Sequence, residues 1–224
     1  MINGIFWNIR GIAKVPNLRR LIKLVRLHQV HFVVICEPKV DVSKIESIRL
    51  RLSFDYVFVN CSSDIWVFYS SPFVCSTVGS SDQHISLHVQ NPLLPSPIIM
   101  SFVHAKCSVE ERRELWCSLL NDKPTIHPWC IGGDFNVILA PHEKRGGRPF
   151  AIAEGADFMS FMEEARVFDV GFSGSSFTWS NNRRSRARIS KRLDRFLVNG
   201  ACLDLSDAIS VLHLTRHPSD HAPL

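Results

Sequence analysis

Residues 129–139 read WCIGGDFNVIL, an apolar stretch interrupted by two glycines, an acid and an amide. Successive side chains of an extended strand point to opposite faces, so Asp134 and Asn136 share one face while Phe135 points into the core. The two glycines carry no Cβ, which lets the backbone bend and lets an anion such as a phosphate approach closely. The same residue types also form ordinary turns. The stretch therefore predicts a buried strand whose end either delivers polar groups to a cleft or simply turns.

Four other segments place a carboxylate, amide or imidazole where an apolar stretch meets a turn or a charged stretch. They are GIFWNIRG (4–11), FVVICEPK (32–39), KRLDRFLV (191–198) and PSDHAPL (218–224). In the second of them Glu37 directly follows five apolar residues, and an ionised group in that position needs a partner. Several such groups on one chain indicate a shared polar site rather than five unrelated turns.

These motifs, in this order, resemble those of the endonuclease/exonuclease/phosphatase superfamily, which includes DNase I and the apurinic/apyrimidinic endonucleases. The matching motifs are WN (7–8), EP (37–38), GDFN (133–136), RLD (192–194) and SDH (219–221). Three further motifs, WNIRG (7–11), EKRGG (143–147) and FTWSN (177–181), are similar to the endonuclease domain of plant LINE-type (non-LTR) retrotransposons. Each motif is weak alone, but five in the family's order argue against a chance match. The resemblance covers essentially the whole chain.

The composition sets broader bounds. A chain of 224 residues with 46% hydrophobic content fits one large domain with a substantial core. The net charge of +5 suits a polyanionic partner. Neither a membrane-spanning apolar stretch nor a secretion leader is evident in the sequence. The seven cysteines are scattered along the chain, which is typical of reduced thiols rather than disulfides. We therefore expect a nuclear or cytoplasmic monomer that binds DNA, without a membrane and without a stable protein partner.

Periodicity and turn residues predict a mixed α/β chain. Capping boxes are expected at Ser43 with Glu46 and at Ser108 with Glu111. The expected helices are 15–28, 44–52, 109–120 and 152–166. The expected strands are 2–8, 32–36, 56–60, 65–69, 73–78, 85–90, 98–104, the strand within 129–139, 177–180, 189–198 and 209–214. Long stretches of strands between helices imply two sheets packed face to face with helices outside. The resemblance implies the same α/β four-layer sandwich of two mostly antiparallel sheets, in which residues 1–224 form one DNase I-like domain that stops at the start of its last strand.

The resemblance also implies a metal-dependent phosphodiesterase. Cleaving a phosphodiester requires a nucleophile made from water and positive charge near the transition state. A hard cation with oxygen ligands supplies that charge, so Mg²⁺ is expected, with Mn²⁺ as the alternative. Glu37 is the first candidate ligand, and Asn8 and Asp220 are expected to contact the metal ion through water.

The remaining motif residues receive catalytic roles. Asp134 is expected to orient or deprotonate the attacking water, and Asn136 to donate a hydrogen bond to a phosphate oxygen. His221 is expected to face the phosphate from the other side, with Asp194 holding its ring through the second nitrogen, because a carboxylate behind an imidazole fixes the tautomer and stabilises the cation. His104 corresponds to a tyrosine that contacts the phosphate in the family.

Three departures from the family pattern leave the activity open. Arg10 stands where the apurinic/apyrimidinic enzymes have an acid, His104 stands in place of the tyrosine, and Leu224 ends the chain where the family's last strand begins. Two hypotheses follow: a Mg²⁺-dependent endonuclease that nicks DNA, derived from a retrotransposon polyprotein, or a catalytically decayed remnant that still binds nucleic acid. A phosphatase acting on small or lipid phosphates is a third option, since the fold alone does not choose the substrate.

A basic segment follows the FTWSN motif. Residues 183–195 hold seven cations and one acid, a net charge of +6, so the rest of the chain sums to −1 and the positive excess lies in this segment. Such a run is usually a solvated loop, but this one leads directly into Asp194. We therefore expect a hairpin that grips phosphates, with Trp179 packed beneath it. The expected nucleic-acid-binding residues are Arg183, Arg184, Arg186, Arg188, Lys191 and Arg145.

Overall fold

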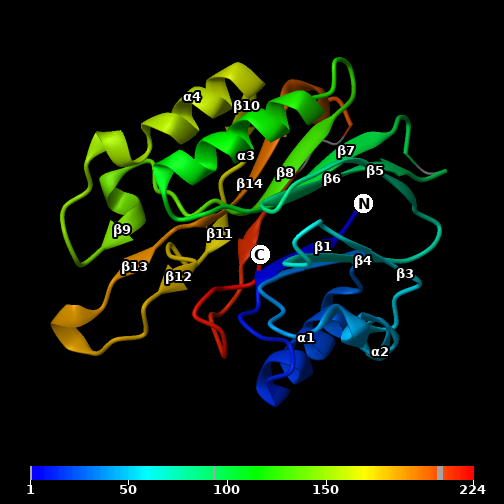
Figure 1. Ribbon diagram of the computed structural model, residues 1–224, viewed down its shortest axis with the longest axis horizontal. Helices are drawn as coiled ribbons and strands as arrows, with labels where there is room; N and C mark the ends of the chain where they lie inside the picture. The colour runs from blue at the N-terminus through cyan, green and yellow to red at the C-terminus, as the bar shows by residue number, and fades with distance from the viewer. Residues whose placement is uncertain (1, 93, 206–208) are drawn as a thin grey trace.

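Two large β-sheets form the centre of the computed structural model, which describes residues 2–92, 94–205 and 209–224 (Figure 1). The first sheet has the strand order β1-β2-β4-β3, with bounds Gly4–Asn8, Phe32–Cys36, Ile65–Tyr69 and Tyr56–Val59. The second has the order β10-β14-β8-β7-β6-β5, with bounds Val167–Asp169, Asp194–Asn199, Trp129–Asp134, Ile98–His104, His84–Gln90 and Val74–Ser80. Within these sheets β1 and β2 run parallel, as do β7 and β8, and the other pairs are antiparallel.

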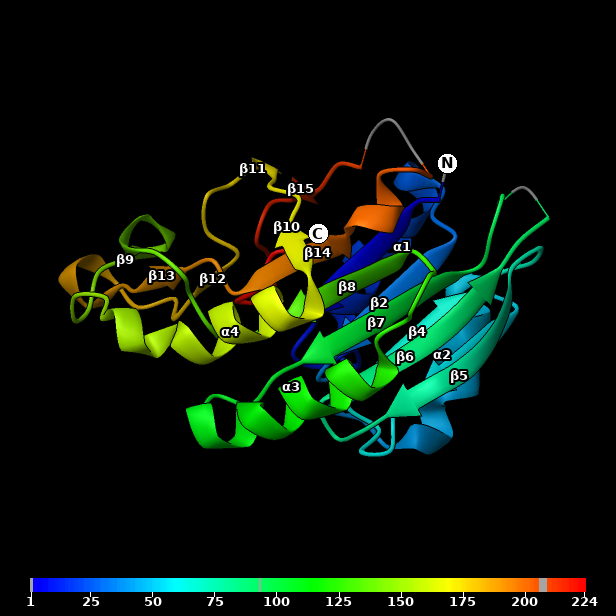
Figure 2. The same cartoon turned by 90° about the horizontal axis from the view of Figure 1, so that it is seen from above.

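The two sheets pack face to face and helices cover their outer faces, as the sequence predicts. Between the sheets, Phe6, Phe32 and Val34 of the first meet Leu87 and Phe102 of the second. On the outer face of the first sheet lie α1 (Val15–His28) and α2 (Ile45–Leu52). On the outer face of the second lie α3 (Val109–Asp122) and α4 (Ala156–Ala165), side by side (Figure 2). The four-layer α/β sandwich is therefore confirmed.

Burial on both faces explains why the central strands are continuously apolar rather than alternating. In β1 the side chain of Phe6 points between the sheets, while Ile5 and Trp7 pack under the outer helices. Strands buried on both sides lack a solvated face and so read as unbroken apolar runs. Such strands leave their polar residues at the ends, which is where the motif residues lie.

Two small sheets extend the fold beside the ends of the long strands. One joins β12 (Trp179–Ser180), β13 (Ser190–Lys191) and β9 (Lys144–Arg145), so the basic segment forms the connection of a hairpin. The other joins β11 (Ser173–Gly174) to β15 (Leu212–His213). At the end of the chain Leu224 exchanges two backbone hydrogen bonds with Phe6 of β1. Short 3-10 turns lie at Val42–Lys44, Pro141–Glu143, Ile152–Glu154, Ser185–Ala187 and Gly200–Cys202.

Several local predictions need correction. The capping box at Ser43 and Glu46 is wrong: Asp41 caps a 3-10 turn through the amide of Ser43, and Glu46 instead pairs with Arg49. The cap at Ser108 is confirmed, since its hydroxyl accepts from the amide of Glu111. The expected strand 189–198 is two strands, and helix 152–166 begins as a 3-10 turn. None of the helices in the described part of the chain is long and apolar enough to cross a membrane.

Candidate active site

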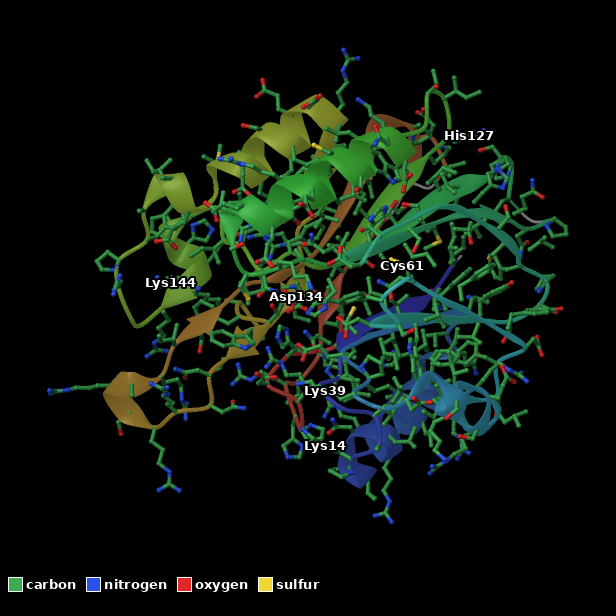
Figure 3. The ribbon with its side chains drawn as sticks, viewed as in Figure 1. Lys14, Lys39, Cys61, His127, Asp134 and Lys144 are labelled. Carbon is green, nitrogen blue, oxygen red and sulfur yellow. The ribbon has the colours of Figure 1, made fainter. Side chains whose placement is uncertain are left out.

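Strand register brings three motif residues to one end of the six-stranded sheet. His104 at the end of β7 pairs with Asp134 at the end of β8, and Asp134 pairs in turn with Asp194 at the start of β14. Asp134 and Asp194 are almost completely buried. Figure 3 shows Asp134 near the middle of the molecule, where the two sheets approach one another. Phe135 anchors this end because its ring packs against Trp116 and Phe158 beneath α3 and α4.

The first sheet contributes two more groups from the ends of its parallel strands. Asn8 is the last residue of β1, and Glu37 follows β2 directly. The amide Nδ2 of Asn8 donates to Oε1 of Glu37 at 3.0 Å and to Oδ2 of Asp134 at 3.1 Å. The same nitrogen lies 3.5 Å from Nε2 of His104. Asn8 therefore joins the polar ends of the two sheets.

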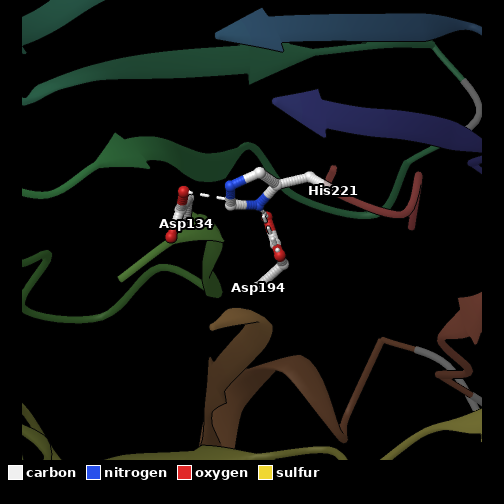
Figure 4. A group of neighbouring side chains, drawn as sticks. All are labelled: Asp134, Asp194 and His221. Carbon is white, nitrogen blue, oxygen red and sulfur yellow. Dashed lines mark hydrogen bonds and ion pairs between the residues drawn. The ribbon is translucent and has the colours of Figure 1, made fainter. Parts of the chain in front are cut away.

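The imidazole of His221 lies between two carboxylates (Figure 4). Its Nδ1 is 3.1 Å from Oδ2 of Asp194 and 3.5 Å from Oδ2 of Asp134. The loop that carries His221 is fixed to β1, because the Trp7 indole donates to the carbonyl of His221 and the Ser219 hydroxyl donates to the carbonyl of Asn8. These contacts make His221, like Asn8, a link between the two sheets.

Burial and charge act in opposite directions on these groups. Burial acts to lower the pKa of His221, but the charges of Asp194 and Asp134 outweigh it and raise that pKa to about 9. Burial raises the pKa of Asp194 above its usual range, while the charge of His221 opposes the rise. An imidazolium held between two buried carboxylates is suited to stabilising negative charge that develops nearby.

Glu37 is surrounded by cationic donors. Its Oε2 is 2.8 Å from Nζ of Lys39, and its Oε1 is 3.2 Å from Nε of Arg10. Burial acts to raise the pKa of Glu37, but hydrogen bonds from Lys39 and Asn8 and the charge of Arg10 lower it to about 2. Asp220 lies on the other side of Arg10 and accepts a hydrogen bond from the Trp179 indole at 3.2 Å.

Asp64 is a site residue that the sequence reasoning missed. Its Oδ2 lies 2.5 Å from Nδ1 of His104, whose other nitrogen is 3.6 Å from Oε1 of Glu37. Burial acts to lower the pKa of His104, but the hydrogen bond with Asp64 and the charge of Asp134 raise it above its usual value. The Asn60 side chain fixes the loop by accepting from the amide of Asp64. The sequence signal was faint, because Asp64 sits in a Ser-Ser-Asp stretch typical of a turn.

The structure shows the contacts of Asn136 and of the two glycines in the 129–139 stretch. Asn136 points its amide Nδ2 at the carbonyl of Ala105, 2.7 Å away, so one of its two N–H donors is already used. Gly132 and Gly133 lack side chains because neighbouring strands pack closely against them, rather than to let an anion approach the backbone. A Cβ on Gly133 would lie 2.2 Å from the carbonyl oxygen of Val103, and one on Gly132 would lie 3.0 Å from the ring of Phe196.

Two groups of ligands could hold a divalent cation. Ligand atoms of Asp134, Asp194 and His221 lie within 4.8 Å of one another. In that group, however, both carboxylate oxygens of Asp194 already face Nδ1 of His221. The second group contains Glu37 and Asn8. The Oδ1 atom of Asn8 is buried and has no hydrogen-bond partner in the described part of the chain, while the Glu37 oxygens already face Nδ2 of Asn8, Nε of Arg10 and Nζ of Lys39. Carboxylate and amide oxygens fit a hard cation such as Mg²⁺, and an unsatisfied buried oxygen favours the second group.

The basic segment divides into a buried part and an exposed part. Arg192 and Arg195 are buried in ion pairs with Glu143 and Asp169, so they are structural cations. The other cations are exposed or half-buried on the hairpin connection, at Arg183, Arg184, Arg186, Arg188 and Lys191, and Arg145 is exposed on the neighbouring β9.

A groove of about 560 Å³ lies against this hairpin. Four arginines line it, at Arg145, Arg186, Arg188 and Arg216, together with Phe177, and it has no acidic lining residue. Arg216 is a second residue that the sequence reasoning missed. Partial burial and then the charge of Arg188 lower the pKa of Arg216, while the charge of Asp220 opposes this shift.

Comparisons with known proteins agree with this geometry. A family model described as "Endonuclease/Exonuclease/phosphatase family" matches residues 5–221. No curated protein matches the chain. Among solved structures, the endonuclease domain of TRAS1, a telomere-specific non-LTR retrotransposon, is 14% identical and has a TM-score of 0.71, with 100% of this chain and 96% of that chain covered.

Two further solved structures have the same fold. The AP endonuclease LMAP from Leishmania major is 13% identical, with a TM-score of 0.74 and 99% of this chain and 86% of that chain covered. The 3′ phosphatase NExo from Neisseria, bound to a product DNA hairpin, is 17% identical, with a TM-score of 0.71 and 100% of this chain and 97% of that chain covered. At these identities the likeness establishes the fold, and the plant origin suggested by the sequence motifs stays a prediction.

Proposed function

Because this chain belongs to the endonuclease/exonuclease/phosphatase family, we propose that it is a divalent-metal-dependent phosphodiesterase that nicks DNA. The observation that carries the proposal is the convergence of Asn8 and His221 on Asp134: the three come from distant parts of the chain, and Asp134 lies within hydrogen-bonding distance of Asn8 and ion-pairing distance of His221. Titratable groups with raised or lowered pKa values that gather at one buried polar centre are typical of a catalytic site.

The side chains have the arrangement that hydrolysis of a phosphodiester requires. Asp134 accepts hydrogen bonds from the backbone N–H of Asn136 at 3.1 Å and from the side chain of Asn8. Its carboxylate is therefore fixed in place, where it can orient a water molecule and accept the proton of that water. His221 is held by Asp194 through Nδ1, and its Nε2 makes no hydrogen bond with a described residue. Nε2 can therefore donate to a phosphate oxygen as negative charge develops on it.

Glu37 and Asn8 are the residues that we propose to hold the metal ion. When bound there, Mg²⁺ or Mn²⁺ would supply positive charge to the phosphate. His104 belongs to the same group of contacts, and Asp64 holds its ring through the 2.5 Å contact at Nδ1. In our proposal His104 takes the phosphate-contacting place of the family's tyrosine, and Asp220 supports the arrangement through Arg10.

The exposed arginines favour DNA over a small phosphate. Side chains that grip several phosphates along a strand are useful for a polymer and superfluous for a small ester. The groove at Arg145, Arg186, Arg188 and Arg216 has no acidic lining residue to offset its charge. We propose that a DNA strand follows this groove from the hairpin towards the site.

Replacing Arg183, Arg184, Arg186 and Arg188 by serine is expected to weaken DNA binding for all sequences alike. Each phosphate contact on duplex DNA contributes about 0.9 to the slope of log affinity against log salt, because bound counterions are released. The fourfold variant should therefore flatten the slope by up to about 3.6. A salt titration by fluorescence anisotropy measures both effects.

A matched control removes four cations elsewhere. Arg19, Lys23 and Arg26 are exposed on α1 and Arg51 is exposed on α2, remote from the hairpin in Figure 1. Replacing these four by serine lowers the net charge equally and should leave the slope within about one unit of the wild-type value. Equal slopes for the hairpin variant and the wild type would make the segment a solvated loop.

The substrate class is tested by comparing a polymer with a small ester. With Mg²⁺ present, the protein should convert supercoiled plasmid to nicked circle and leave p-nitrophenyl phosphate essentially unhydrolysed. Rapid hydrolysis of the small ester without nicking would favour the phosphatase alternative. Binding of DNA without either reaction would favour the decayed remnant.

A further inference from the structure

Arg10 lies between two acids of the site. Its Nε is 3.2 Å from Oε1 of Glu37 and 3.2 Å from Oδ1 of Asp220. These carboxylates come from the two ends of the chain, one after β2 and one from the loop before His221. A guanidinium in this position does for the pair what a bound cation would do, because it neutralises two acids that would otherwise repel one another.

The backbone around Arg10 is held in an uncommon conformation. Arg10, Glu37 and Lys39 all have positive φ angles, of 49°, 49° and 51°. For residues with a side chain this region is strained, and such strain persists only where neighbouring contacts enforce it. Three residues of this kind in two adjacent loops indicate that the loop shapes serve the site.

Backbone contacts enforce that conformation. The amide of Gly11 donates to the carbonyl of Glu37 at 2.8 Å, which ties the two loops together. The side chain of Asn17 donates to the carbonyls of Ile9 and Gly11, at 2.7 and 2.9 Å, and so brackets Arg10. The side chain of Arg10 is consequently placed at the site by a fixed loop rather than by a mobile one.

The outer end of the Arg10 side chain remains available. The side chain is 40% exposed, and its two terminal nitrogens make no hydrogen bond with any residue that the structure describes. Guanidinium groups bind phosphate oxygens through two parallel N–H donors. One side chain can therefore pair electrostatically with the two acids, with Nε 3.2 Å from each carboxylate but hydrogen-bonded to neither, and face a phosphate with its terminal nitrogens.

We propose that Arg10 is a fixed positive charge that takes the place of a second metal ion. It fixes Glu37 and Asp220, restricts the centre to one divalent cation held by Glu37 and Asn8, and grips a phosphate oxygen of the DNA. This inference rests on the proposed function, since it concerns the same site and the same substrate. Lys39, whose Nζ contacts the outer oxygen of Glu37, adds to the positive charge but does not bridge the two acids in the structure.

The two parts of the proposal predict changes of opposite sign in one variant. In Arg10→Gln the loss of a nearby cation should tighten binding of Mn²⁺ by about tenfold or more, or expose a second binding position, because like charges repel strongly at this range. The same change should weaken binding of a 20-base-pair duplex in excess chelator and reduce its salt slope by about 0.9. A side chain with a merely structural role would lower both affinities or neither.

Electron paramagnetic resonance titration of Mn²⁺ against the DNA-free protein measures the first effect, and fluorescence anisotropy with chelator measures the second. Arg49→Gln is the matched control, because Arg49 also pairs with an acid, Glu46, but on the outer helix α2. It should change neither quantity. Circular dichroism and a thermal melt of each variant establish that it is folded.

Unchanged or weaker Mn²⁺ binding by folded Arg10→Gln would overturn the role of Arg10 as a cation substitute. Unchanged duplex binding would overturn the phosphate contact. Glu37→Gln separates this inference from the proposed function. If the wild type binds Mn²⁺ and Glu37→Gln does not, the proposed metal site stands whatever Arg10 does. If the wild type binds no Mn²⁺, the proposed metal dependence and this inference fail together.

Discussion

Replacing His221 by glutamine is expected to slow DNA nicking by roughly a hundredfold or more, as loss of a transition-state donor typically does. Glutamine retains an N–H donor but cannot carry the positive charge that the carboxylates of Asp194 and Asp134 stabilise on the imidazole. Single-turnover conversion of supercoiled plasmid measures the rate. Circular dichroism and a thermal melt check that the variant is folded.

The companion variant Asp194→Asn tests whether the pair acts as a unit. Asp194 contacts Nδ1 of His221 at 3.1 Å and is completely buried, so it should act through the ring rather than on DNA directly. Residues that act together lose activity non-additively. The double variant should therefore be about as slow as His221→Gln alone. A double variant whose loss equals the product of the two single losses would contradict this coupling.

The second large effect concerns stability. Arg195→Met is expected to lower the free energy of unfolding by about 3–5 kcal/mol at neutral pH, the usual cost of removing one partner from a buried ion pair. Arg195 is 1% exposed and pairs with Glu143 and with Asp169, which Arg192 also contacts. Without it, the buried Glu143 and the half-buried Asp169 share one cation, Arg192. Urea unfolding measures the change, and Arg183→Met, at an exposed position, is the control that should change stability by less than about 0.5 kcal/mol.

This loss should depend on pH in a defined direction. Burial acts to raise the pKa of Glu143, but the hydrogen bond and charge of Arg195 lower it overall, and Arg192 does the same for Asp169. A lowered folded-state pKa contributes stability above the unfolded values of about 4.3 for Glu and 3.9 for Asp, and that contribution disappears as the pH falls through the folded value. The difference between wild type and Arg195→Met should thus shrink below about pH 4. A difference that stays constant from pH 7 to pH 3 would contradict the assignment.

The sequence predicts the layers and most of the site because both depend on local patterns. Each of Asn8, Glu37 and Asp134 stands at the end of an apolar strand, and strands buried on both faces can place polar groups only there. The pairing of β7, β8 and β14 that brings His104, Asp134 and Asp194 together is a long-range register, which a single sequence does not encode visibly.

The parts that were missed have physical reasons. Asp64 lies in a turn-like stretch, and its importance comes from a contact with His104, forty residues away. The seven cations of the basic segment look equivalent in sequence, yet Arg192 and Arg195 are buried because Glu143 and Asp169 reach them from other elements. The role proposed for Arg10 likewise depends on Asp220, at the opposite end of the chain.

Conversion of supercoiled plasmid to nicked circle, with Mg²⁺ and again with excess chelator, tests the central claim most directly. The account predicts nicked circle with Mg²⁺, none with chelator, and recovery when excess Mg²⁺ is restored. Asp134→Asn, examined in parallel, should be slower by roughly a hundredfold or more, because it removes the group that orients or deprotonates water. Equal activity of wild type and Asp134→Asn, or nicking that persists in chelator, would contradict the account.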